Sequence, residues 1–157
     1  MNSKNIRKGT YCLLINLEAD LPIKIGKKGK MNFDKGCYVY VGSAMNSLDG
    51  RIRRHLRNNK KLHWHVDYLL DNQKSSVFDV YLSDDGVKHE CELANYIACA
   101  GKEVQGFGCS DCKCNSHLVY FSNIADAESA CLNAFKKMGL ELKIWRFKWL
   151  IWKMKVN

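Results

Sequence analysis

Two short apolar runs, residues 9–16 (GTYCLLIN) and 37–41 (CYVYV), leave this chain few ways to fold. The second is rich in β-branched and aromatic residues, which is typical of a buried strand, and Gly42 is expected to end it. The first is apolar and ends in a polar turn, so it also predicts a strand. Other expected strands lie at 77–82, 117–121 and 140–144, with a short strand and a turn at 22–33.

Helices are predicted between these strands. In residues 48–58 the apolar side chains recur every four positions, which gives one buried face, and Ser47 or Asn46 is the expected N-cap. Residues 60–70 predict a loop that enters a short helix. Two further helices are expected at 87–100 and at 126–138, each followed by a glycine. Alternating strands and helices favour an α/β or α+β sheet layer with helices packed on it.

The net charge of +9 on 157 residues indicates a polyanionic partner. Nucleic acid is the first candidate and an acidic membrane surface the second, and the alternative is a generic basic surface. With 46% hydrophobic residues the chain can bury a core, and no apolar run is long enough to predict a transmembrane helix.

The cysteines and the first residues bear on the cellular compartment. Several of the eight cysteines lie inside apolar runs, where a thiol behaves as a small hydrophobe. Residues 1–8 are polar and basic, which is typical of a short arm and not of a signal peptide. We therefore expect a reducing compartment and a cytoplasmic protein.

One set of residues fits the chemistry of phosphodiester cleavage, which needs a base, a cation beside the phosphate, and a metal or an acid at the leaving oxygen. Tyr11 and Tyr40 offer a phenol, and Arg51 offers a planar positive charge that matches phosphate. Glu90 or Glu92 offers an oxygen ligand for Mg²⁺. The alternative for the tyrosines is that they are ordinary strand residues.

The predicted helix at 48–58 is strongly basic. Beside Arg51 it carries Arg53, Arg54, His55 and Arg57, and it has no carboxylate after Asp49. This pattern favours a surface that faces phosphate, of which one or two side chains touch the ligand. The alternative is a solvated helix face.

The chain resembles the GIY-YIG nuclease superfamily, and within it the DUF123 family most closely. The resemblance covers residues 9–121. The motifs that carry it are GTY at 9–11, YVGSA at 40–44, LxxRxRRH at 48–55, HWHVDYLL at 63–70, ECxLA at 90–94 and GFGxSDCxCxxHL at 106–118.

The resemblance implies a small antiparallel or mixed sheet of about three central strands flanked by helices. It implies that Tyr11 deprotonates or positions the water, that Arg51 stabilises the phosphate, and that Tyr40 and His55 also line the site. A glutamate holds one Mg²⁺ or Mn²⁺ ion. Glu90 fits the motif, and Glu92, which also lies early in that helix, is the alternative ligand. The two cannot easily share one ion, because residues two apart on a helix point to different faces.

We expect residues 9–124 to form the GIY-YIG-like domain. Residues 125–157, outside the resemblance, are expected to form a C-terminal helix and a basic aromatic tail packed on the domain. The stretch between the two tyrosine motifs is longer than is typical of the superfamily. The residues expected to contact nucleic acid are Ser43, Arg53, Arg54, Arg57, His63 and His65.

The resulting expectation is a metal-dependent endonuclease that hydrolyses phosphodiester bonds in DNA repair or processing, with DNA favoured over RNA. A non-catalytic nucleic-acid-binding module is one alternative. An accessory partner of a DNA-repair enzyme is another, suggested by family members fused to endonuclease III-like proteins.

Two other clusters carry open interpretations. Cys109, Cys112, Cys114 and His117 have spacing that suits a zinc site, and the alternative is a tight loop whose thiols bond to backbone amides. The alternating polar residues at 63, 65 and 67 either belong to the active site, bind a metal, or are hydrogen-bonded groups packed under Trp64. The aromatic and basic tail at 144–156 either docks on the domain or stacks on nucleic acid.

Overall fold

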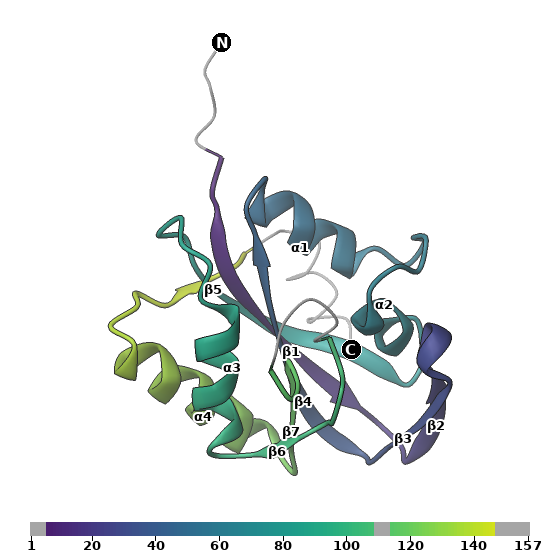
Figure 1. The fold of residues 1–157 in the computed structure, drawn as a ribbon. Coiled ribbons are helices and arrows are strands. Elements are labelled where there is room, and N and C mark those ends of the chain that lie inside the picture. Colours follow the sequence, from purple (N-terminus) through teal and green to yellow (C-terminus); the bar gives the residue numbers. More distant parts are fainter. Residues whose placement is uncertain (1–5, 109–113, 147–157) are drawn as a thin grey trace.

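The centre of the molecule is an antiparallel pair of long strands, β1 (Gly9–Leu17) and β4 (Gly36–Ala44). Figure 1 shows this pair in the computed structural model, which describes residues 6–108 and 114–146. A third long strand, β5 (Ser75–Ser83), pairs antiparallel with the other edge of β1. These are the three central strands that the sequence predicted.

The sheet continues beyond these strands on both sides. β7 (Leu118–Phe121) pairs with β4, and the two-residue strands β6 (Lys102–Glu103) and β8 (Lys143–Ile144) form the edges. The order is β6-β7-β4-β1-β5-β8, and every pairing is antiparallel. A separate hairpin joins β2 (Leu21–Lys24) to β3 (Lys30–Phe33) through a 3₁₀ turn at Gly26–Lys28.

Both faces of the sheet are covered by helices (Figure 1). The side chains of β1 alternate between the two faces. Tyr11, Leu13 and Ile15 belong to the core cluster that includes α1 (Leu48–Leu56) and α2 (His65–Leu70). Cys12 and Leu14 belong to the cluster that includes α3 (Glu90–Ala98) and α4 (Ile124–Lys137). The period of two places Tyr11 on the α1 face.

The mixed α+β architecture agrees with the prediction, but the sheet is larger than the expected three strands. The six-stranded sheet gains β7 beside β4 and the short strands at both edges. Of the strand expected at 140–144, only Lys143–Ile144 pairs, and β4 continues through Gly42 to Ala44. A two-residue edge strand is too short to show an alternating pattern in the sequence.

The helix ends follow specific side-chain contacts. The Ser47 hydroxyl accepts a hydrogen bond from the Gly50 N–H at 3.0 Å and caps α1. The helix expected from residue 87 begins only at Glu90, because the His89 N–H donates to the Thr10 hydroxyl at 2.8 Å. That bond ties the start of α3 to β1, on which Tyr11 also lies.

Segments from the two ends of the described chain meet on α1. The Arg7 guanidinium donates to both carboxylate oxygens of Asp49, at 2.7 and 3.1 Å. The buried Trp145 indole N–H donates to the same carboxylate at 2.9 Å. Trp145 thus docks on the domain, whereas the other tail aromatics, Phe147, Trp149 and Trp152, lie outside the described residues. None of the helices described here is long and apolar enough to cross a membrane.

Candidate functional site

A cleft of about 780 Å³ opens where α1, α2 and the start of α3 meet the ends of β1 and β4. Polar, ionisable and aromatic side chains line this cleft. They include Tyr11, Tyr40, Ser43, Arg51, His63, Trp64, His65, Glu90, Cys91, Glu92 and His117.

Tyr11 lies at the floor of this cleft, and its hydroxyl is 2.7 Å from His55 Nε2. The phenol ring is buried, with 1% of the residue exposed. Burial raises the pKa of the Tyr11 hydroxyl well above its ordinary value, although the nearby positive charge of Arg51 opposes the rise. The hydroxyl therefore keeps its proton, and it shares a hydrogen bond with His55 Nε2.

Gly42 explains how Tyr11 reaches this position. The two residues are paired across β1 and β4, and a Cβ atom at position 42 would lie 2.5 Å from the Tyr11 oxygen. Any larger residue would displace the phenol. The glycine in the second motif, YVGSA, is therefore needed to make room for the tyrosine of the first motif, GTY. The two motifs thus form one unit across the strand pair.

His55 lies on the inner face of α1 and is neutral. Burial, together with the smaller effect of the neighbouring guanidinium groups of Arg51 and Arg54, lowers its pKa to about 3, against the opposing charge of Asp67. The negative charge of Asp67 beside Nδ1 favours the tautomer with its proton on Nδ1, and Nε2 then accepts the hydrogen bond from the Tyr11 hydroxyl. Among the described residues His55 Nδ1 has no hydrogen-bond partner, but it faces the Asp67 carboxylate at 3.8 Å.

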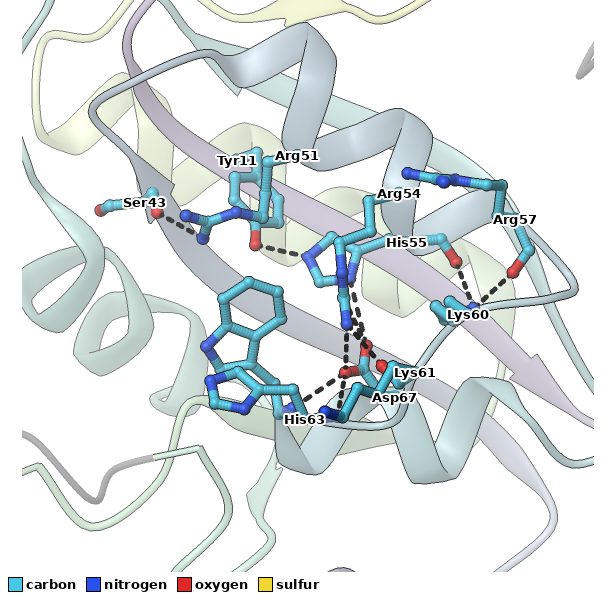
Figure 2. A network of polar contacts seen from close by, with 11 residues as sticks. Tyr11, Ser43, Arg51, Arg54, His55, Arg57, Lys60, Lys61, His63 and Asp67 are labelled. Carbon is cyan, nitrogen blue, oxygen red and sulfur yellow. Dashed lines mark hydrogen bonds and ion pairs between the residues drawn. The ribbon is translucent and has the colours of Figure 1, made fainter.

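Asp67 is the fully buried anion behind this pair. Figure 2 shows the Arg54 guanidinium bonded to its carboxylate; both Nη–Oδ distances are 3.0 Å. The backbone N–H groups of His63 and Trp64 donate to the same carboxylate at 2.7 and 2.8 Å. Burial acts to raise the pKa of Asp67, but these donors outweigh it and hold the pKa below its ordinary value. Asp67 therefore remains charged.

Two arginines of α1 stack on the Trp64 ring, and they differ in what neutralises them. The guanidinium carbons of Arg51 and Arg54 each lie 4.5 Å from the centre of an indole ring of Trp64. Arg54 is paired with Asp67, whereas no carboxylate of the described residues forms an ion pair with Arg51. The Arg51 Nη1 donates to the Ser43 carbonyl at 3.1 Å (Figure 2), which fixes its guanidinium at the cleft wall.

Glu90 is the first residue of α3 and also lines the cleft. Its carboxylate oxygens lie 3.4 Å from Lys88 Nζ and 3.9 Å from His117 Nδ1. Its side chain is 21% exposed. Burial raises the pKa of Tyr40, and the negative charge of Glu90 raises it further. Glu90 and Tyr40 therefore face the same space.

The family described as domain of unknown function DUF123 matches residues 10–140. The chain belongs to the DUF123 family. The match runs past residue 121, where the resemblance was expected to end, and includes α4. No curated protein and no solved structure matches the chain.

The DUF123 domain brings the five predicted catalytic residues together at one cleft. Tyr11, Tyr40, Arg51 and Glu90 line the cleft directly. His55 lies behind Tyr11 and is 2% exposed. Glu92, the alternative metal ligand, lines the same cleft, so position alone does not separate the two glutamates.

The residues predicted to contact nucleic acid divide into two groups in the DUF123 domain. Ser43, His63 and His65 line the cleft, and His65 Nδ1 accepts a hydrogen bond from the Gly108 N–H at 2.8 Å. Arg53 and Arg57 are exposed on α1 and do not line the cleft. Arg54 is held by Asp67, an interaction that the sequence analysis did not foresee.

The cysteine-rich loop of the DUF123 domain is only partly described. Cys109 and Cys112 lie outside the described residues. Cys114 and His117 instead group with Cys91, the second residue of α3, and the three ligand atoms lie within 4.8 Å of one another. Sequence reasoning missed Cys91, although it immediately follows the predicted metal ligand Glu90.

The buried His55 makes the stability of the DUF123 domain dependent on pH. Its ordinary pKa of 6.5 falls to about 3 in the folded chain. Between these two pKa values the unfolded chain takes up a proton on this histidine and the folded chain does not. The free energy of unfolding should therefore decrease as the pH falls, by about 2 kcal/mol from this group between pH 7 and pH 5. Urea unfolding should give a flatter pH dependence for His55→Gln than for the natural chain, and equal slopes would contradict this account.

Proposed function

We propose that this DUF123 domain is a metal-dependent endonuclease of the GIY-YIG type, which hydrolyses phosphodiester bonds in nucleic acid, with DNA favoured. The observation that carries the proposal is that Tyr11, Arg51 and Glu90 come from β1, α1 and α3 and converge on one cleft. The net charge of +9 supports a polyanionic substrate.

Arg51 is the proposed phosphate ligand. Its guanidinium is fixed by Ser43 and by stacking on Trp64, and no described carboxylate neutralises it. A guanidinium held in place before the substrate arrives stabilises the charge that grows on the phosphate during attack. Arg54 has a similar place on Trp64, but its pairing with Asp67 suits it to holding α1 against α2.

Tyr11 is proposed to orient the attacking water. Its proton is committed to His55 Nε2, so a lone pair of its oxygen remains to accept a hydrogen bond from a water in the cleft. During attack Tyr11 would hold this water in place through that hydrogen bond. The Asp67 carboxylate, 3.8 Å from His55 Nδ1, would keep the imidazole in the tautomer whose Nε2 accepts from Tyr11.

Glu90 is the proposed ligand for Mg²⁺ or Mn²⁺. The donor chemistry fits, because a partly exposed carboxylate on a cleft wall suits a hard ion that keeps several waters. Such an ion supplies positive charge to the phosphate and the leaving oxygen. Glu90 itself would hold the ion in the cleft that Arg51 also lines, so that both positive charges would be available to the scissile phosphate.

Glu90→Gln and Glu92→Gln form a matched pair that tests the metal ligand. We expect Glu90→Gln to lower metal-dependent cleavage about 10²-fold or more, because a neutral amide binds the ion poorly, while salt-dependent binding of DNA remains. Glu92→Gln should keep most of the cleavage. The assay follows fragments of labelled duplex, flapped and abasic DNA in Mg²⁺ or Mn²⁺, with binding measured in parallel. If the two variants cleave alike, Glu90 is not the ligand.

A further inference from the structure

Three soft or borderline metal ligands meet beside the cleft without any role in the proposed cleavage. They are the thiols of Cys91 and Cys114 and the imidazole of His117. Cys91 is in the first turn of α3, and the other two precede β7, so the chain folds back to bring them together. All three ligand atoms lie within 4.8 Å of one another.

The spacing suits a tetrahedral zinc ion. Zinc–sulfur bonds of about 2.3 Å and zinc–nitrogen bonds of about 2.0–2.1 Å place the ligand atoms of one tetrahedron about 3.5–3.8 Å apart. The Cys91 Sγ and His117 Nε2 atoms are 3.6 Å apart. This pair thus already has the separation that two ligands of a single zinc ion require.

The surroundings of His117 also suit a metal ligand. The residue is 4% exposed, its Nε2 faces Cys91, and its Nδ1 faces the Glu90 carboxylate at 3.9 Å. Metal-bound histidines usually present the second ring nitrogen to a carboxylate or a carbonyl, which fixes the tautomer and the ring orientation. With the proton on Nδ1, the Nε2 lone pair is directed at the proposed ion.

We propose that Cys91, Cys114 and His117 bind one thiophilic divalent ion of the Zn²⁺ class at the wall of the cleft. Two thiolates and an imidazole select zinc over Mg²⁺ or Mn²⁺, so this site differs from the proposed oxygen site at Glu90. The three ligands leave one tetrahedral position for a further ligand. The ion joins the first turn of α3 to the segment before β7 and thereby fixes the neighbouring Glu90.

The test is zinc content, measured by mass spectrometry on the purified full chain after zinc loading under reducing conditions and removal of loose metal. We expect one zinc ion per chain in the natural protein. It should be lost in Cys91→Ser, Cys114→Ser and His117→Gln. Cys99→Ser is the matched control, because Cys99 is an exposed thiol just after the same helix, and it should keep the zinc.

A second readout does not depend on the folding of variants. Cobalt bound to the natural chain should give a thiolate-to-metal charge-transfer band, which zinc displaces and which Cys99→Ser retains. No zinc and no such band, a Cys91–Cys114 disulfide that persists in the reducing buffer, or zinc that persists in Cys91→Ser would each overturn the site. Neither readout involves nucleic acid, so the outcome is independent of the proposed nuclease activity.

Discussion

Arg51→Ala is expected to lower the rate of nucleic-acid cleavage about 10²-fold to 10³-fold, because it removes the fixed charge proposed to meet the scissile phosphate. Folding should change little, since the Arg51 guanidinium makes one hydrogen bond to the Ser43 carbonyl and stacks on Trp64. The measurement is single-turnover cleavage of a labelled DNA substrate under saturating protein. Saturation removes any contribution of weaker binding from the comparison.

Arg57→Ala is the matched control for this experiment. Arg57 is an exposed arginine at the C-terminal end of the same helix and lies outside the cleft. It should weaken binding only modestly, in a salt-dependent way, and leave the rate of the bound complex unchanged. Equal rates for the natural chain and Arg51→Ala would remove Arg51 from the reaction.

Asp67→Ala is expected to lower the free energy of unfolding by about 3–5 kcal/mol, because it leaves a partly buried guanidinium without its anion. The side chain of Asp67 is fully buried and accepts four hydrogen bonds, two from Arg54 and two from the backbone at the start of α2. Loss of the carboxylate would also remove the contacts by which Asp67 holds the Trp64 backbone and Arg54 together. Urea unfolding of the purified variant gives the value directly.

Asp71→Ala provides the comparison for that measurement. Asp71 is an exposed aspartate at the C-terminal end of α2, in contrast to Asp67 in its first turn. It should change the free energy of unfolding by less than about 0.5 kcal/mol. A loss at Asp67 no larger than the loss at Asp71 would mean that the buried ion pair does not hold α1 and α2 together.

The elements that the sequence predicted well are those with local causes. The aromatic and β-branched run at 37–41 lies within β4, and the capped, amphipathic segment predicted at 48–58 forms α1, which ends at Leu56. In these cases residues close in the chain decide the outcome.

Contacts between distant segments escaped prediction because no local pattern encodes them. Arg54 bears a charge that suits phosphate, yet Asp67, from the next helix, binds it with two hydrogen bonds. Cys91 joins Cys114 and His117 only because α3 begins beside the segment before β7. The edge strands β6 and β8 depend on neighbours that the sheet supplies, not on their own two residues.

The central claim is tested most directly by incubating the natural chain with labelled DNA in Mg²⁺ or Mn²⁺ and comparing the products with those formed in EDTA. The account predicts shorter labelled fragments that form only with the divalent ion and that form far more slowly with Arg51→Ala and with Glu90→Gln. Tight, salt-dependent binding without fragments on every DNA and RNA substrate would contradict it, and would identify the cleft as a binding surface.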